Sequence, residues 1–129
     1  MTNINFKREI ADTLEHAIER VTKALSAEGF GILTRIDMQT TIHEKIGKKI
    51  VPTMILGACN PNLAYEAYTA NSDVASLLPC NAVIREIAPG KISVELAAPS
   101  GLMRILGDAN LNELASEADT RIKRALANV

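Results

Sequence analysis

The sequence predicts an α+β fold, with a single sheet of about five strands, mostly antiparallel or mixed, and helices packed mainly on one face. Segments with strand alternation and segments with helical spacing of apolar residues follow one another along the chain. A Pro-Gly turn at residues 89–90 joins the last two strand segments into an antiparallel hairpin. Because the chain has 129 residues, with no linker and no internal repeat, we expect one domain over residues 1–129.

Five segments have the composition and alternation of strands: 3–10, 30–37, 53–59, 80–87 and 92–96. The second segment begins with apolar residues on both faces, so we expect its first half to be buried on both sides. The fifth alternates cleanly between apolar and polar residues, which predicts one buried and one solvated face.

The first and last helices each begin with a capping-box pattern. Asp12 followed by Glu15 marks the start of the first helix, which we expect to end near Gly29. Asn110 followed by Glu113 marks the start of the last helix. Both helices carry an apolar stripe at helical spacing, which predicts packing against the sheet.

Shorter helices are expected between the strands. Asp37 is placed to cap a short helix that stops at Gly47. Asn60 followed by Pro61 is typical of a helix start, with asparagine at the N-cap and proline at the first helical position. A further helical turn is expected over residues 74–78.

Composition and charge exclude several classes of partner. The net charge of −1 gives no basic face for nucleic acid. No apolar run approaches the roughly 20 residues of a membrane span, and residues 1–8 lack the apolar region of a secretory signal. The glycines at 29 and 31 follow a helix instead of preceding one, so they do not form a phosphate loop. We therefore expect a cytoplasmic protein with no nucleic-acid partner, no membrane partner and no cofactor.

The stretch that is best suited to chemistry contains both cysteines of the chain, Cys59 and Cys80, each followed directly by an asparagine, Asn60 and Asn81. Cys59 ends a predicted strand just before a helix N-terminus, where the helix dipole favours a thiolate and lowers the pKa of a cysteine. If the third and fourth strands are neighbours, the two thiols lie at the same end of the sheet. Such a pair could cycle to a disulfide, bind a soft metal or accept sulfur, with the asparagines as fixed dipoles beside it.

A structural interpretation of the same residues is also open. Free cysteine is among the most buried residue types and packs like a small hydrophobe, and capping a helix is a sufficient role for Asn60. A closed zinc site is not expected, because Cys59 and Cys80 with no nearby histidine supply half of a ligand set.

Four motifs in the same order resemble the bacterial and archaeal family called domain of unknown function 302. They are FGILTRID at 30–37, EKIG at 44–47, ILGACNP at 55–61 and LLPCN at 77–81. The resemblance covers nearly the whole chain and implies a small α+β domain that is commonly a homodimer, with no established activity. It places the family's motif cysteines and asparagines on the four residues of the two Cys-Asn pairs, and its helix-starting proline on residue 61.

Three functions follow from these observations. The first is a small dimeric binding module with a site at Cys59, Asn60, Cys80 and Asn81, for a small anion, a sulfur species or a soft metal. The second is a thiol enzyme or redox carrier, with Cys59 as the nucleophile and Cys80 as its resolving partner. The third is a structural or interaction protein whose thiols are buried and inert, and whose open sheet face pairs in a dimer.

Overall fold

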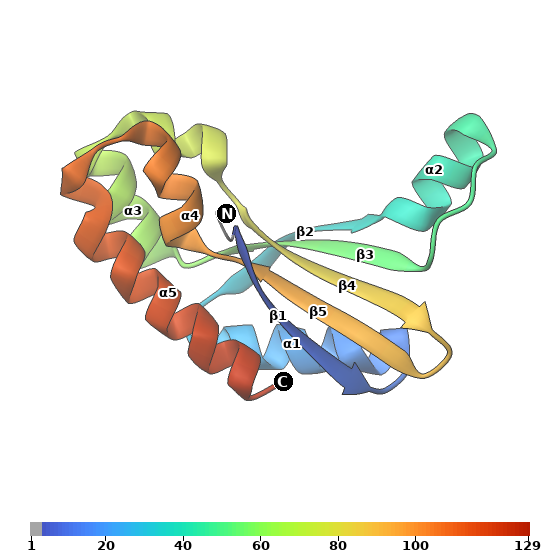
Figure 1. Ribbon diagram of the computed structural model, residues 1–129. Coiled ribbons are helices and arrows are strands. Elements are labelled where there is room, and N and C mark those ends of the chain that lie inside the picture. Colours follow the sequence, from blue (N-terminus) through green and yellow to red (C-terminus); the bar gives the residue numbers. More distant parts are fainter. Residues whose placement is uncertain (1–3) are drawn as a thin grey trace.

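The computed structural model describes residues 4–129 and contains one five-stranded sheet with the strand order β1-β5-β4-β3-β2. Every neighbouring pair in this sheet is antiparallel, so the α+β prediction is confirmed (Figure 1). The predicted hairpin is formed by the fourth and fifth strands. The strands are β1 (Asn5–Ala11), β2 (Gly31–Asp37), β3 (Thr53–Cys59), β4 (Cys80–Ala88) and β5 (Lys91–Ala97).

Five α-helices and three 3₁₀ turns connect and cover the strands of the described chain. The α-helices are α1 (Leu14–Ala27), α2 (Met38–Ile46), α3 (Pro61–Ala70), α4 (Pro99–Met103) and α5 (Asn112–Ala127). The 3₁₀ turns are η1 (Ser72–Leu77), η2 (Arg104–Leu106) and η3 (Ala109–Leu111). The helices α1 and α5 lie along one face of the sheet, whereas α2 projects away from its end (Figure 1). None of the helices within residues 4–129 combines the length and the hydropathy that a membrane crossing requires.

The core lies between the sheet and the pair α1 and α5. On the sheet side, the core consists of rows of residues that lie opposite one another on neighbouring strands. One such row is Leu56, Ala82 and Leu96. The two helices supply apolar residues that face these rows, including Val21 and Ile122. The opposite face of the sheet, which we call the open face, is not covered by α1 or α5 (Figure 1).

The start of α1 differs from the capping-box prediction. Thr13, and not Asp12, is the N-cap, and its hydroxyl accepts a hydrogen bond from the amide of His16. Asp12 accepts hydrogen bonds from the side chains of Arg20 and His16, both at 2.7 Å. The Arg20 guanidinium, followed by the Thr13 amide and His16, lowers the pKa of the Asp12 carboxyl to about 2.

The start of α5 also differs from its prediction, because residue 110 lies in η3 and caps no α-helix. Asp108 caps η3 instead, by accepting a hydrogen bond from the amide of Asn110. At its other end, α5 is tied to the first strand. The guanidinium of Arg8 donates to the carbonyl oxygens of Leu126, Ala127 and Val129 at 2.9–3.2 Å, which satisfies acceptors that a helix C-terminus leaves unpaired.

Two predictions about strand burial are wrong. β2 is an edge strand, so its first half is not buried on both sides, and Leu33 is 66% exposed. β5 lies between β1 and β4, and its polar residues Ser93 and Glu95 are buried although they lie on the face expected to be solvated. The carboxylate of Glu95 is buried because it is paired, accepting hydrogen bonds from Asn5 and Arg85.

Candidate functional site

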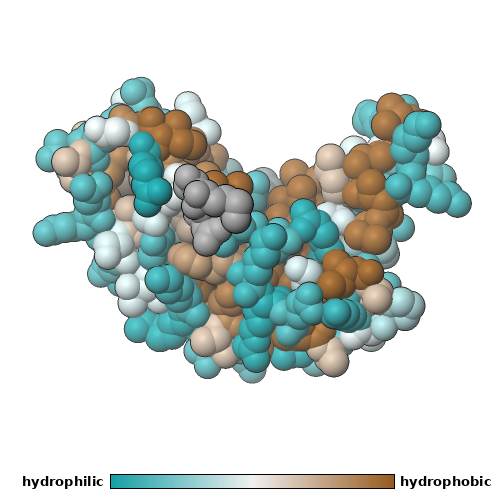
Figure 2. Space-filling view, in the orientation of Figure 1, coloured by the Kyte–Doolittle hydropathy of each residue, from teal (hydrophilic) through white to brown (hydrophobic). Residues whose placement is uncertain are grey.

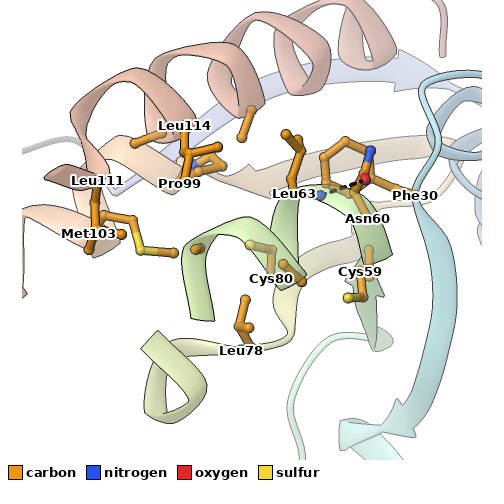
Figure 3. Close-up of a pocket in the computed structure, with 15 residues that line it drawn as sticks. Phe30, Cys59, Asn60, Leu63, Leu78, Cys80, Pro99, Met103, Leu111 and Leu114 are labelled. Atoms are coloured by element: carbon orange, nitrogen blue, oxygen red, sulfur yellow. Dashed lines mark hydrogen bonds between the residues drawn. The ribbon is translucent and has the colours of Figure 1, made fainter. Parts of the chain in front are cut away.

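A small apolar cavity of about 50 Å³ lies where β3 ends, α3 begins and β4 begins (Figure 3). Both cysteines line it, and no lysine, arginine, histidine or carboxylate does. Asn60 is the one amide side chain in its wall. The remaining lining is apolar and comes from several elements: Phe30, Ala58, Leu63, Ala64, Ala67, Leu78, Pro99, Met103, Leu111, Leu114, Ala115 and Ala118.

Cys59 and Cys80 are both free thiols, and they differ in exposure. Cys59 is half-buried at the last position of β3, directly before the helix α3, as the sequence predicts. Cys80 is buried at the first position of β4. Burial, with smaller contributions from the neighbouring Cys59 and Asp119, raises the pKa of the Cys80 thiol to about 11. Cys80 is therefore protonated at neutral pH.

The predicted adjacency of the third and fourth strands is confirmed, since β3 and β4 pair directly. Cys80 lies opposite Ala58, so Cys59 is displaced from it by one residue along β3. Successive side chains on a strand point to opposite faces of a sheet, and the two thiols leave their strands in different directions. Figure 3 shows the two sulfurs apart, with neither directed at the other. Both line the cavity, but they are not arranged as a poised disulfide pair.

Asn60 has a structural role that uses both ends of its amide. Its Oδ1 accepts a hydrogen bond from the amide of Leu63 at 3.2 Å, which makes it the predicted N-cap of α3. Its Nδ2 donates to the carbonyl oxygen of Glu28 at 3.4 Å, which ties α3 to the end of α1. The side chain is 5% exposed and packs so close to Gly29 that a Cβ there would lie 2.9 Å from Nδ2.

Asn81 is not part of this cavity. It is exposed, lies opposite Gly57 in the β3–β4 ladder and lines a separate groove on the open face. That groove shares one residue, Leu78, with the wall of the thiol cavity. The structure therefore brings together three of the four predicted site residues at one cavity and places the fourth in a separate groove.

Several residues of the cavity wall come from the last third of the chain and are absent from the predicted site. Met103 reaches the cavity from α4, and Leu114 reaches it from α5 (Figure 3). The helix α4 is held against α5 by Asp119, which accepts hydrogen bonds from the amide and hydroxyl of Ser100. The position of this segment relative to the cysteines depends on the tertiary fold, which local sequence patterns do not give.

The thiol cavity does not resemble a closed metal centre made of hard ligands. Within residues 4–129, no group of three or more histidine, cysteine, aspartate or glutamate side chains is arranged to hold a metal ion. The donors at the cavity are the sulfurs of Cys59, Cys80 and Met103, together with the amide of Asn60. This donor set is soft, and the amide already has two partners.

The fold and the cavity define a small α+β protein with a thiol-lined apolar cavity at one end of an antiparallel sheet. The model of the family described as domain of unknown function DUF302 matches residues 6–129, and the chain belongs to this family. A solved structure with the same fold is the crystal structure of an uncharacterised conserved DUF302 protein from Bacillus stearothermophilus. It has a TM-score of 0.90 and 26% sequence identity over 97% of each chain. No curated protein matches the sequence.

Proposed function

We propose that this chain is a small cytoplasmic binding module that acts as a homodimer and takes a small soft ligand into the thiol cavity. One observation carries the proposal: two free cysteines from neighbouring strands line the same apolar cavity. A volume of about 50 Å³ suits a ligand of a few atoms, because a cavity needs roughly 10–15 Å³ of such volume to hold one water.

The lining favours a soft metal ion or an uncharged sulfur species over a small anion. An anion in an apolar cavity needs a cationic partner, and no lysine, arginine or histidine lines this one. Thiolate and thioether sulfurs select soft metal ions such as Cu(I). Cys59 and Cys80 each offer a thiol sulfur, which loses its proton when a metal binds, and Met103 offers a thioether sulfur.

The alternative function, a thiol enzyme, is supported by the position of one cysteine and not by that of the other. Cys59 is half-buried and precedes α3, a position that suits a nucleophile. Cys80 is a poor resolving partner, because its raised pKa keeps it protonated and its side chain does not point toward Cys59. The binding function is therefore the better supported of the two.

Titration with Cu(I), supplied from a chromogenic chelator that competes for the ion, tests the metal form of the proposal. We expect one Cu(I) per chain to transfer to the wild-type protein, and the transfer to be lost in Cys59→Ser and in Cys80→Ser. Asn81→Ala is the matched control, because residue 81 does not line the thiol cavity and lines a separate groove, so its loss should leave binding unchanged.

The sulfur form is tested with dissolved hydrogen sulfide, followed by NMR of the methyl groups around the cavity. We expect the methyl signals of Met103 and Leu63 to shift, and those of Val129 in the core to stay unchanged. If the serine variants bind both probes as tightly as the wild type, or if the wild type binds neither, the binding proposal is wrong and the thiols are structural.

A further inference from the structure

The strand β2 forms one edge of the sheet, and its outer side has no partner strand among residues 4–129. Six of its seven residues are exposed, and the seventh is half-buried. In an antiparallel ladder, every second residue of a strand turns its N–H and C=O away from the strand it is paired with. Since β3 pairs with only one side of β2, the other side presents backbone donors and acceptors to a further strand.

The two edges of the sheet differ in how they are protected against a further strand. The opposite edge, β1, carries a run of three exposed charged residues: Lys7, Arg8 and Glu9. Charged side chains on an edge strand discourage pairing with another chain. Residues 31–36 of β2 include a single charged residue, Arg35, and expose Leu33 by 66% and Ile36 by 44%. Hydrophobic side chains are also at the surface where β2 runs into α2 (Figure 2), so β2 is the edge that is open to pairing.

The regular part of this edge is residues 34–37. The register of β2 against β3 shifts between Ile32 and Thr34, and from residue 34 to the end of β2 the pairing is continuous. Strands in globular proteins are usually about 3–10 residues long. The continuous part of β2 is therefore long enough to pair with a short extended segment.

A groove of about 680 Å³, which we call the α1 groove, lies between this edge and the helix α1. Arg35 lines it from β2, and the other lining residues come from α1: Ile18, Glu19, Thr22, Lys23, Ser26 and Ala27. Successive side chains on a strand point to opposite faces of the sheet. A strand added beside β2 therefore directs every second side chain toward the α1 groove, next to Arg35. The remaining side chains lie on the other face, next to Ile36.

The charges of the α1 groove favour an acidic side chain. Two cations, Lys23 and Arg35, and one anion, Glu19, line it. Within residues 4–129, none of these three side chains takes part in an ion pair. Opposite charges that face each other on neighbouring strands stabilise the pairing, and so do apolar side chains that face each other. The best partner for Arg35 is thus an acidic residue, and the best partner for Ile36 is an apolar one.

We propose that the edge of β2 and the α1 groove form a docking site for an extended peptide segment of another protein, in which acidic and apolar residues alternate. The segment adds one strand to the sheet. Its backbone hydrogen bonds to β2 supply affinity, and its alternate side chains supply specificity. The acidic side chains enter the α1 groove beside Arg35 and Lys23, and the apolar side chains cover Ile36.

A second copy of β2 fits this edge less well than an acidic segment does. Residues 31–36 contain no acidic residue, and the side chain that they direct toward the α1 groove is Arg35. Two copies paired edge to edge would therefore bring cations together. The docking site shares no lining residue with the thiol cavity, so this inference goes beyond the proposed function and does not rest on it.

NMR titration of the isotope-labelled protein with the peptide acetyl-Val-Glu-Val-Glu-Val-amide tests the docking site. We expect the backbone amide signals of residues 34–37 and 22–27 to shift, and those of α5 to stay unchanged. The same peptide with a methyl group on every backbone nitrogen cannot donate hydrogen bonds to β2, so it should not bind.

Charge exchange tests the specificity. We expect Lys23→Glu with Arg35→Glu to raise the dissociation constant of the glutamate peptide at least about tenfold. The same double variant should bind acetyl-Val-Lys-Val-Lys-Val-amide more tightly than the wild type does. Both replaced side chains are exposed, so the fold is expected to stay intact. Arg104→Glu is the control, because residue 104 is an exposed cation that does not line the α1 groove.

Three results would overturn the inference. The first is a wild type that does not bind the glutamate peptide at millimolar concentration. The second is binding that charge exchange or methylation of the peptide leaves unchanged. The third is a set of signals from residues 34–37 that shift on dilution of the protein alone, which would assign this edge to pairing with a second copy.

Discussion

Cys80 lies directly opposite Ala58 in the antiparallel ladder between β4 and β3. This register places Cys59 one residue further along, with its side chain leaving the strand on the other side. The two thiols are thus neighbours in the fold, yet they occupy different environments, one half-buried and the other buried. This geometry favours two cysteines that act as separate sulfur ligands. It does not favour a pair that forms and breaks a disulfide between them.

The two cysteines should differ strongly in reactivity. We expect Cys59 to be alkylated by iodoacetamide in the native protein at pH 8, and Cys80 to stay unmodified until the protein is denatured. Cys80 is buried and its pKa is raised to about 11, so neither access nor the thiolate form is available at this pH. Peptide mass mapping over time measures both rates. Equal rates for the two thiols would contradict this assignment.

Asn60 should contribute to stability through its cap as well as through its position in the cavity wall. Asn60→Ala removes the acceptor for the Leu63 amide and should lower the free energy of unfolding by about 0.5–2 kcal/mol. Asn60→Asp keeps a cap acceptor and loses the donor to Glu28, so it should cost less. Urea denaturation of the two variants gives the comparison. If Asn60→Asp is less stable than Asn60→Ala, the capping hydrogen bond to Leu63 contributes less to stability than the other contacts of the Asn60 side chain.

Gly57 is required because β2 and the segment before β4 approach it too closely for a side chain. A Cβ at this position would lie 2.2 Å from Oγ1 of Thr34 and 2.7 Å from Cγ of Pro79. We expect Gly57→Ala to destabilise the protein by about 1–3 kcal/mol, as overpacking usually does. Gly31→Ala is the matched control, since a Cβ there meets no atom within 4 Å. Chemical denaturation should give the Gly31→Ala variant a free energy of unfolding close to that of the wild type. A Gly57→Ala variant as stable as the wild type would be inconsistent with this packing.

Asp12 should make the start of α1 sensitive to acid. Its pKa is lowered from 3.8 to about 2 in the folded protein, chiefly by Arg20, so its contribution to stability is complete above pH 4. That contribution is lost as the pH falls from 3.8 toward 2, because the carboxyl must then be protonated. Asp12→Asn should therefore lower the melting temperature at pH 7 and have a progressively smaller effect below pH 4. If the difference in melting temperature between the wild type and Asp12→Asn does not change with pH, the ion pair with Arg20 is not its cause.

The order of the elements is predictable from the sequence because most of its signals are local. Pro61 after Asn60 gives the start of α3 correctly, and the boundaries of β3 match the predicted 53–59. The N-cap of α1 was predicted wrongly because two neighbouring residues compete for the same capping position. Thr13 and Asp12 can each accept an amide hydrogen, and Asp12 instead pairs with Arg20, whose side chain reaches it only once the helix has formed.

The candidate site is less predictable, because it depends on strand order and on contacts between distant segments. The sequence identifies Cys59, Asn60 and Cys80 as a group, and the pairing of β3 with β4 brings them to one cavity. Asn81 lies outside this cavity, since successive side chains on β4 point to opposite faces and its neighbour Cys80 lines the cavity. Met103 carries no local signal of a site, and only the packing of α4 against α5 shows that it lines the cavity.

The position of β1 beside β5 has a consequence for how the protein is made. Residues 5–11 are synthesised long before residues 91–97, which form their neighbour in the sheet of the described chain. Arg8 likewise has no carbonyl oxygens to bind until Leu126, Ala127 and Val129 have been synthesised. The strand β1 therefore stays unpaired until residues 91–97 have been synthesised. Folding that closes such long loops is slow, so we expect the pairing of β1 with β5 to be a late step in forming the sheet.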